Sequence, residues 1–435
     1  MRRSAPLKKI ACVLALSFPA VTLADVSAVD VAAKAVEPHV IEWRRHLHAN
    51  PELSNREVKT ADFIAKKLRS WGLEVKTGVA MNGVTALLKG GKPGRIIALR
   101  ADMDALPVTE QTDVPFKSTV TTTFRDEKVG VMHACGHDGH VAILLGVAEA
   151  LVKMKDTLPG QVLFVFQPAE EGPPDGERGG ARVMLEQGVF SAPKPDAMIG
   201  LHLMASLNTG VIGYKPGPLM AGSDQFSIVV TGVQTHGSRP WAGVDPISVS
   251  GQIITGLQTI VSRQIDITQV PAVITVGAIK GGIRFNIIPD SVEMIGTVHN
   301  FDPQMRADIV RRMETTASNI AAASGAKAVV KFRDEVSLPP VINDAELTQR
   351  AVPLFEQLVG KDNVRLLGLQ TVAEDFSLFG AQVPSLFFWV GVTPRDKDPA
   401  TVPFNHSPLF YLDEAALVTG VRAMLSLTTA FLENT

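Results

Sequence analysis

The sequence His133-Ala134-Cys135-Gly136-His137-Asp138-Gly139-His140 places five side chains that bind metals in proteins within eight residues. Cys135 and His137 are separated by one residue, so they would face opposite sides of a helix but the same side of an extended or looped backbone. The apolar run 141–148 follows with helical spacing. We therefore predict a loop that leads into the N-terminus of a helix, a usual place for a functional site. The alternative is a polar loop whose histidines only cap that helix.

The chain has 435 residues, of which 46% are hydrophobic and 20% are charged. This length favours two domains, and this composition is typical of a soluble globular protein with a large core. The N-terminus differs, because four basic residues precede the apolar run 10–23, which ends in the small-residue pattern Thr22-Leu23-Ala24. The pattern predicts a secretory signal peptide over residues 1–24, cleaved near Ala24, and a secreted or periplasmic protein.

Removal of residues 1–24 leaves 38 basic and 44 acidic side chains, a net charge of about −6. This charge argues against a nucleic-acid partner or an anionic membrane surface. Of the two cysteines in the sequence, Cys12 lies in the signal peptide and only Cys135 remains. An exported protein that cannot form an internal disulfide, with its one thiol among histidines, indicates a thiol held by metal. A free buried cysteine is the alternative.

Three apolar segments typical of buried strands are each followed by polar residues of the kinds that bind metal. The segments are 95–100, 161–167 and 197–201, and the residues that follow them are Asp102 and Asp104, Glu170 and Glu171, and His202. Ligands of open α/β sheets sit at the carboxyl ends of the strands, so we expect these residues to meet. Asp102 and Asp104 are expected to orient the metal ligands from behind or to bind metal themselves. Adjacent Glu170 and Glu171 point apart, so one can bind metal while the other faces the attacking water.

The pattern changes between about residues 216 and 332. Predicted strands and helices there follow the order β-α-β-β-α-β, with helices over 246–263 and 303–324. We interpret 216–332 as an inserted α+β, ferredoxin-like domain, and 25–215 with 333–435 as one mixed-sheet α/β/α core. Helices are also predicted over 26–73, broken at Asn50-Pro51, over 345–359, and from Asp413 to about residue 432.

The candidate metal ligands outnumber those of a single tetrahedral site. They are Cys135, His137, Glu171, His202 and His406. Five protein ligands, one of them bridging, suit two ions about 3.5–4 Å apart. Such a pair binds a hydroxide and polarises a carbonyl. Glu170, next to a ligand, can take the proton of a metal-bound water and pass it to a leaving amine. The pattern predicts metal-assisted hydrolysis of an amide.

Several motifs in order resemble the M20 metallopeptidases, and in particular the amidohydrolases that cleave N-acyl amino acids, such as hippurate and auxin-conjugate hydrolases. The motifs lie at 102–107, 133–140, 168–172, 285–290 and 374–376. The resemblance runs from about Trp43 to the C-terminal helix. It implies a metallopeptidase core, and a lid and dimerisation domain over 216–332.

The resemblance also implies the same five metal ligands, with Glu170 as general base. It implies that His236 in the lid stabilises the oxyanion and that Asn286 contacts the substrate. The sequence departs from the family pattern in three places: Gln234-Thr235-His236 with Pro240-Trp241 in the lid motif, His299 where arginine is common, and Arg284 where a small residue is usual. Arg284 is therefore a candidate to bind the substrate carboxylate in place of the missing arginine.

These observations predict an exported two-metal amidohydrolase that acts on the C–N bond of small N-acyl amino acids. A dipeptidase or an aminoacyl-glutamate carboxypeptidase is the alternative within the enzymes, and a non-catalytic metal-binding relative is the alternative outside them. A thiolate with imidazoles favours zinc for the two divalent ions, although manganese, cobalt or nickel would fit. The expected partners are a small-molecule substrate and other copies of the chain, in a dimer or a tetramer of dimers, with no membrane contact after signal removal.

Overall fold

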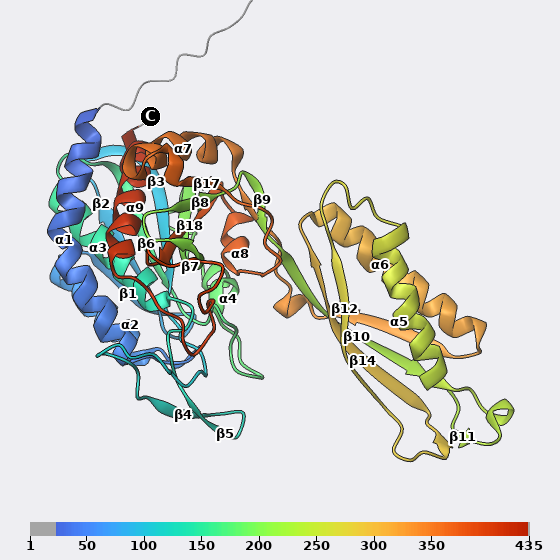
Figure 1. Ribbon diagram of the computed structural model, residues 1–435. Helices are drawn as coiled ribbons and strands as arrows, with labels where there is room; N and C mark the ends of the chain where they lie inside the picture. The colour runs from blue at the N-terminus through green and yellow to red at the C-terminus, as the bar shows by residue number, and fades with distance from the viewer. Residues whose placement is uncertain (1–22, 434–435) are drawn as a thin grey trace, which may run out of the picture.

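The computed structural model describes residues 23–433, and the larger of its two units is built on an eight-stranded mixed sheet (Figure 1). The strand order is β1-β2-β6-β3-β7-β18-β8-β17, and the central strands β6, β3, β7 and β18 are parallel. The strands are β1 (Glu74–Val79), β2 (Gly83–Lys89), β3 (Lys92–Asp102), β6 (Pro159–Gln167), β7 (Ala197–Asn208), β8 (Ile212–Tyr214), β17 (Val364–Leu366) and β18 (Ser385–Thr393). The parallel strands are apolar throughout because helices cover both faces of the sheet.

One face of the sheet carries α1 (Leu23–Ala49), α2 (Val58–Ser70), α3 (His137–Met154), α7 (Ala345–Val359) and α9 (Ala415–Glu433), and the other carries α4 (Gly180–Glu186) and α8 (Phe376–Gly380). Gly146 lies where α1, α3 and α9 meet, and a Cβ there would approach Val40 to 2.5 Å. The small residue thus lets α1 pack closely on α3. Helix α9 is long and apolar enough to span a membrane, but it is mostly buried against α1 and α3, as in the core helix of a globular protein.

The smaller unit is a four-stranded antiparallel sheet with two helices on one face (Figure 1). Its elements are β10 (Gly222–Thr231), α5 (Pro246–Arg263), β12 (Val273–Gly281), β14 (Ser291–Asn300), α6 (Pro303–Ala323) and β15 (Lys327–Phe332), in the sheet order β12-β14-β10-β15. Alternate residues of β10 are buried under the helices. Successive side chains of a strand point to opposite faces, and the helices cover only one face of this sheet. Asp245 and Asp302 cap the two helices and each precedes a proline, a strong start signal.

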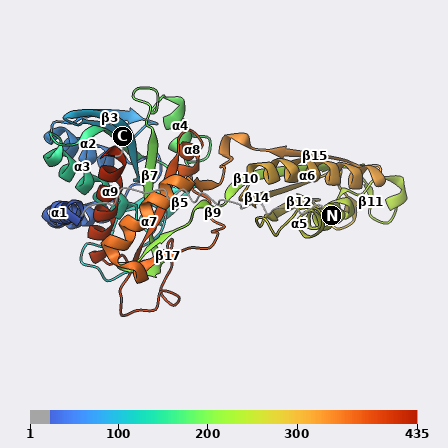
Figure 2. The same ribbon diagram turned by 90° about the horizontal axis from the view of Figure 1, so that it is seen from above.

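The chain passes from one unit to the other between Met220 and Gly222. Strand β9 (Gly217–Met220) still pairs with β16 (Val341–Asn343), and Leu219 and Met220 belong to the core of the larger unit. Two views at right angles show the smaller unit, residues 222–332, extending away from the larger one as an arm (Figures 1 and 2). We call this unit the arm.

The structure confirms the predicted α/β class with a mixed sheet between helical layers. The prediction that the strand starting at Ala197 ends at His202 is wrong, because β7 continues to Asn208. Residues 203–208 stay largely apolar and pair with β18 up to Thr393, so His202 lies inside the strand. Sequence patterns also missed short strands such as β4 (Thr121–Phe124), β5 (Glu127–Gly130), β11 (Thr235–His236) and β13 (Ile287–Ile288). Such strands are too short to show the alternation of apolar and polar residues that predicts a strand.

Candidate metal centre

The cluster at 133–140 lies at the start of α3, beside the carboxyl ends of β3 and β6. Gly136 is the N-cap residue of α3 and has φ 98°, a left-handed conformation that other residues rarely adopt. This turn separates Cys135, on the loop, from His137, the first residue of the helix. The predicted loop leading into a helix N-terminus is therefore present.

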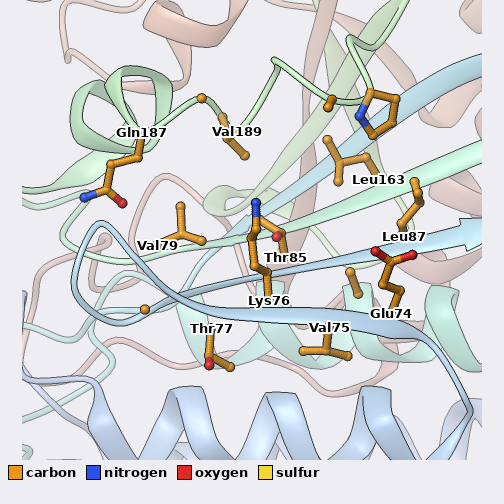
Figure 3. Close-up of a pocket in the computed structure, with 15 residues that line it drawn as sticks. Glu74, Val75, Lys76, Thr77, Val79, Thr85, Leu87, Leu163, Gln187 and Val189 are labelled. Carbon is orange, nitrogen blue, oxygen red and sulfur yellow. The ribbon is translucent and has the colours of Figure 1, made fainter.

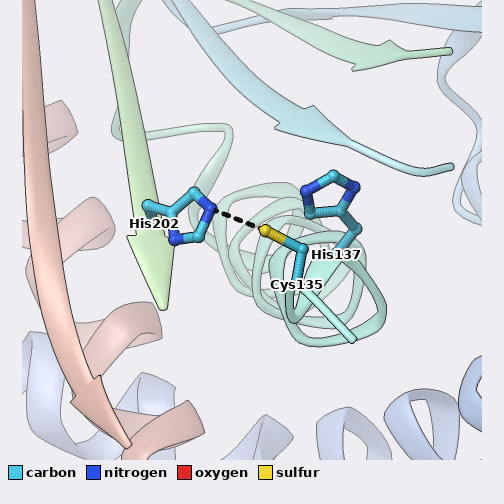
Figure 4. A group of neighbouring side chains, drawn as sticks. All are labelled: Cys135, His137 and His202. Carbon is cyan, nitrogen blue, oxygen red and sulfur yellow. Dashed lines mark hydrogen bonds between the residues drawn. The ribbon is translucent and has the colours of Figure 1, made fainter. Parts of the chain in front are cut away.

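Two groups of candidate ligands share Cys135. The ligand atoms of each group lie within 4.8 Å of one another, and the groups are Cys135, His137 and His202, and Cys135, Glu171 and His406. The Cys135 Sγ lies 3.3 Å from His202 Nε2 (Figure 4). It lies 3.2 Å from His406 Nε2. Glu171 Oε1 is 3.1 Å from His406 Nε2. The structure thus gathers all five predicted ligands around one sulfur atom, an arrangement that suits a thiolate between two ions.

Two of the histidines are oriented by backbone carbonyls. His137 donates from Nδ1 to the carbonyl oxygen of Asp104 at 2.8 Å, and His202 does the same to Leu203 at 2.8 Å. Their Nε2 atoms therefore turn toward the centre. The His137 Nε2 is buried and has no hydrogen-bond partner within the described residues 23–433. A buried orphan nitrogen beside a thiol, a carboxylate and two further imidazoles fits a metal ligand, and the donor set suits Zn²⁺.

His140 also lies in this cluster, but it supports neighbouring residues through hydrogen bonds. Its Nδ1 hydrogen-bonds Asp102, and its Nε2 accepts from the backbone N–H of Leu203 at 2.8 Å. Both ring nitrogens are therefore engaged. Asp102 in turn accepts from Arg100 at 2.8 Å. Asp102 is thus placed to hold the cluster from behind, which is one of the two roles expected for it.

Asp104 fixes the two adjacent glutamates through their backbone. Its carboxylate accepts from the N–H groups of Glu170 and Glu171 at 3.1 and 3.0 Å, and from the Ser54 hydroxyl at 2.7 Å. Ala169, just before them, has φ 52°. Both glutamates form a group with His137, but only Glu171 also belongs to the group containing Cys135 and His406.

Glu170 lies in an acidic and buried environment next to the ligands. Its Oε2 is 3.9 Å from His137 Nε2, and it groups with Asp102 and Glu374. Burial, followed by the charges of Glu374 and Glu171, raises the pKa of Glu170 well above its ordinary value. A carboxylate with a raised pKa is a stronger base than an ordinary one.

A buried network behind Glu170 was only partly visible in the sequence. Arg100 donates to Glu374 at 2.8 Å and to Asp375 at 3.1 Å, and Gln167 donates to Asp375 at 2.7 Å. Residues 374–376 form one of the motifs recognised in the sequence, whereas no sequence motif indicated a role for Arg100. Arg100 could have been identified from its position at the end of an apolar strand, because a buried charged residue requires a buried partner.

The hydrogen bond that protonated His406 makes to Cys135, followed by its hydrogen bond to Glu171, raises the pKa of His406 to about 10. Independently of protonation, Cys135, Glu171 and His406 bring together a sulfur, a carboxylate oxygen and an imidazole nitrogen, donor types that bind divalent cations. His406 itself has φ 72°, and its backbone N–H donates to the carbonyl of Ala134 at 2.8 Å. This bond ties its loop directly to the 133–140 stretch.

His236, Asn286 and Arg284 lie elsewhere, on the arm. His236 on β11 pairs with Ile287 on β13, and the N–H of Gly237 donates to the Asn286 carbonyl at 2.8 Å. Strand β11 lies at the end of the arm farthest from the larger unit (Figures 1 and 2). The structure therefore brings these three residues to one another but not, within a single chain, to Cys135.

His299 and Arg284 occupy opposite ends of the arm. His299 lies near the end of β14 that adjoins the larger unit, and burial lowers its pKa. The segment with Arg284 joins β12 to β13, where Gly281 pairs with Val292 near the start of β14. Arg284 therefore does not fill the place of residue 299 within one chain. The two positions can serve one site only if they come from different copies.

A separate cavity of about 380 Å³ lies between β1, β2 and segment 187–193 (Figure 3). It is lined by apolar residues such as Leu163 and by the polar side chains of Glu74, Lys76, Thr77, Thr85 and Gln187. None of the described residues that line it is a cysteine or a histidine. This cavity therefore lacks the thiol and imidazole ligands of the cluster around Cys135.

Comparisons with known proteins agree with this geometry. Residues 98–430 match peptidase family M20/M25/M40. Thermostable carboxypeptidase 2 of Saccharolobus solfataricus is 42% identical over 400 residues, which cover 92% of this chain and 96% of the relative. N-acetylcysteine deacetylase of Bacillus subtilis is 39% identical over 416 residues, which cover 93% of this chain and 100% of the relative.

A solved structure of similar sequence comes from the Bacillus subtilis YXEP protein, described as a dinuclear metal-binding peptidase of the M20 family. It has a TM-score of 0.77 and 36% identity, over 92% of this chain and all of the other. The match of most of the chain confirms the resemblance inferred from the motifs. The chain therefore belongs to peptidase family M20/M25/M40 and is a metal-dependent hydrolase of C–N amide bonds.

Proposed function

We propose that the protein is an exported amidohydrolase that uses two divalent ions to cleave small N-acyl amino acids. The observation that carries this proposal is the pair of ligand groups that share Cys135, with Glu170 beside them. The names of relatives support the substrate class, because they include an N-acyl-L-amino acid amidohydrolase of Geobacillus stearothermophilus, 42% identical over 308 residues that cover 71% of this chain and 79% of that one. The carboxypeptidase relatives support peptides as the second candidate.

Each residue of the centre has a defined task in this proposal. Cys135, His137, His202, Glu171 and His406 would hold the ions, zinc being the best match to the donors. When bound, the ions would lower the pKa of a water molecule and polarise the scissile carbonyl. Glu170 would take a proton from the attacking water and deliver it to the nitrogen of the leaving amine. Arg100 and Glu374 hold the buried charges around Glu170 in fixed positions.

Apolar side chains near His406 favour an acylated amine over a free one. Phe404 and Leu409 lie on the His406 loop and are 51% and 47% exposed. An apolar acyl group would cover such surface, whereas the charged ammonium group of a dipeptide would lose hydration there. This feature supports N-acyl amino acids with a large acyl group as the preferred substrates.

A hydrolysis panel on one sample of known metal content tests the proposal. We expect N-benzoyl and N-octanoyl derivatives of one amino acid to be cleaved roughly tenfold faster, in kcat/KM, than its N-acetyl derivative, and dipeptides slowest. Removal of the ions with a chelator should abolish all hydrolysis, and zinc should restore it. Cleavage of dipeptides alone would establish the peptidase alternative, and the absence of any hydrolysis would favour a non-catalytic relative.

We also propose that the chain forms a dimer in which the arm of one copy reaches the metal centre of the other. The remote position of His236 supports this, because an oxyanion needs a donor at hydrogen-bond distance. In such a dimer the partner's arm would supply His236, Asn286 and Arg284 to the site. His299 would remain near the chain's own centre.

Mixing two inactive variants tests this arrangement. Glu170→Gln chains and His236→Ala chains are combined under conditions that allow subunit exchange. A mixed dimer then has one site with both defects and one with neither, so roughly a quarter of wild-type activity should return. Proven exchange without recovered activity would show that His236 acts in its own chain or not at all.

The proposed export rests on the sequence of residues 1–24, of which 1–22, including Cys12, lie outside the described residues. N-terminal sequencing of the protein recovered outside the cytoplasm should begin near Asp25. An intact N-terminus in the cytoplasmic fraction would contradict export.

A further inference from the structure

His48 on α1 lies between two buried carboxylates. Its Nδ1 is 2.8 Å from Asp138 Oδ2, and its Nε2 is 3.0 Å from Glu110 Oε1. The side chain is only 2% exposed. Carboxylates accept hydrogen bonds, so both ring nitrogens donate and the ring carries a positive charge. Burial lowers the pKa of His48, but the two carboxylates outweigh it and the pKa is raised overall.

Asp138 connects His48 to the first ligand loop. It follows His137 in the first turn of α3 and also accepts from Arg44 Nε at 2.9 Å. Arg44 and His48 are four residues apart and share one face of α1. Gly136, the N-cap of α3, offers no side chain to hold this end of the helix. The start of α3, and with it His137, is therefore anchored to α1 through Asp138.

Glu110 connects His48 to the second ligand loop. Its carboxylate accepts from the Thr112 hydroxyl at 2.5 Å and from the Ser118 N–H at 2.6 Å, which fixes the segment around it. The next residue, Gln111, donates its N–H to the carbonyl of Pro408 at 2.8 Å. Pro408 is two residues beyond His406. A displacement of Glu110 would therefore reach the loop that carries this ligand.

We propose that His48 is a positioning residue that holds the loops of His137 and His406 at the spacing needed to bind two ions. The inference rests on the proposed metal centre, but not on the substrate. Loss of the ring would remove the cation between the two buried carboxylates. Arg44 would still pair with Asp138, but Glu110 would lose its charged partner, and repulsion between the carboxylates would separate the two loops. Groups that orient metal ligands from behind commonly control affinity by 10–100-fold.

The test compares His48→Gln with His46→Gln, a matched variant on the same helix. His46 is exposed and stacks on Phe63, away from both loops. Zinc affinity of the full chain is measured by competition with a chromophoric chelator, and the melting temperature of the metal-free protein is measured alongside. We expect His48→Gln to weaken binding of at least one ion by about 10–100-fold, and His46→Gln to leave it unchanged.

Glu110→Gln is the second variant, since it keeps the side-chain shape and removes one charge. It should weaken zinc binding in the same direction, by about tenfold, and it decides the matter if His48→Gln does not fold. Wild-type affinity in a folded His48→Gln protein would overturn the proposal, and so would a lower melting temperature with unchanged affinity. A wild-type chain that binds fewer than two ions would instead refute the two-metal centre.

Discussion

Glu170→Gln is expected to lower the rate of amide hydrolysis by about 100-fold or more and to leave both ions in place. The glutamine amide keeps the size of the carboxylate but does not accept a proton from water. Backbone position should not change, because Asp104 holds the N–H of residue 170 and not its side chain. The measurement is kcat/KM on an N-acyl amino acid together with elemental analysis of the same sample.

Glu171→Gln is the matched control, because it alters the neighbouring carboxylate by the same single group. Glu171 belongs to the group with Cys135 and His406, so this variant should lose an ion. The two variants therefore separate proton transfer from metal binding. If Glu170→Gln lost metal while Glu171→Gln retained it, the roles of the two glutamates would be the reverse of those proposed.

Sequence patterns over a few residues predicted many of the helices and strands, because local interactions such as helix capping determine where these elements begin and end. Helices α5 and α7 begin at an aspartate cap and have the predicted limits, and the buried strands follow from apolar runs. The end of β7 was not predictable, because its length is set by pairing with β18, far away in sequence. The same holds for Arg100, whose partners Glu374 and Asp375 are more than 270 residues away.

The candidate site also combines features that the sequence predicts with features that only the fold determines. The sequence indicated which residue types would gather at the sheet edge, and the structure brings the five predicted ligands together. Spacing alone did not indicate which of them both groups share, since that depends on the fold around His202 and His406. The motif containing His236 likewise carried no information on the direction in which the arm extends. That direction is a property of the connection at 220–222 and of contacts far from His236.

Replacement of Cys135 is expected to have the second large effect, on metal content and on hydrolysis. Because both ligand groups contain its sulfur, Cys135→Ala should remove a donor from both ions at once, with loss of both and of nearly all hydrolysis. His202→Ala is the comparison, since it lies in one group only and should cost mainly one ion. Each variant is titrated with zinc and its bound metal counted after gel filtration, with circular dichroism to verify the fold. If Cys135→Ala still held two ions per chain, or lost the same single ion as His202→Ala, the sulfur would not join the two sites. In that case the second ion would depend on Glu171 and His406, whose contact at 3.1 Å does not require the thiol.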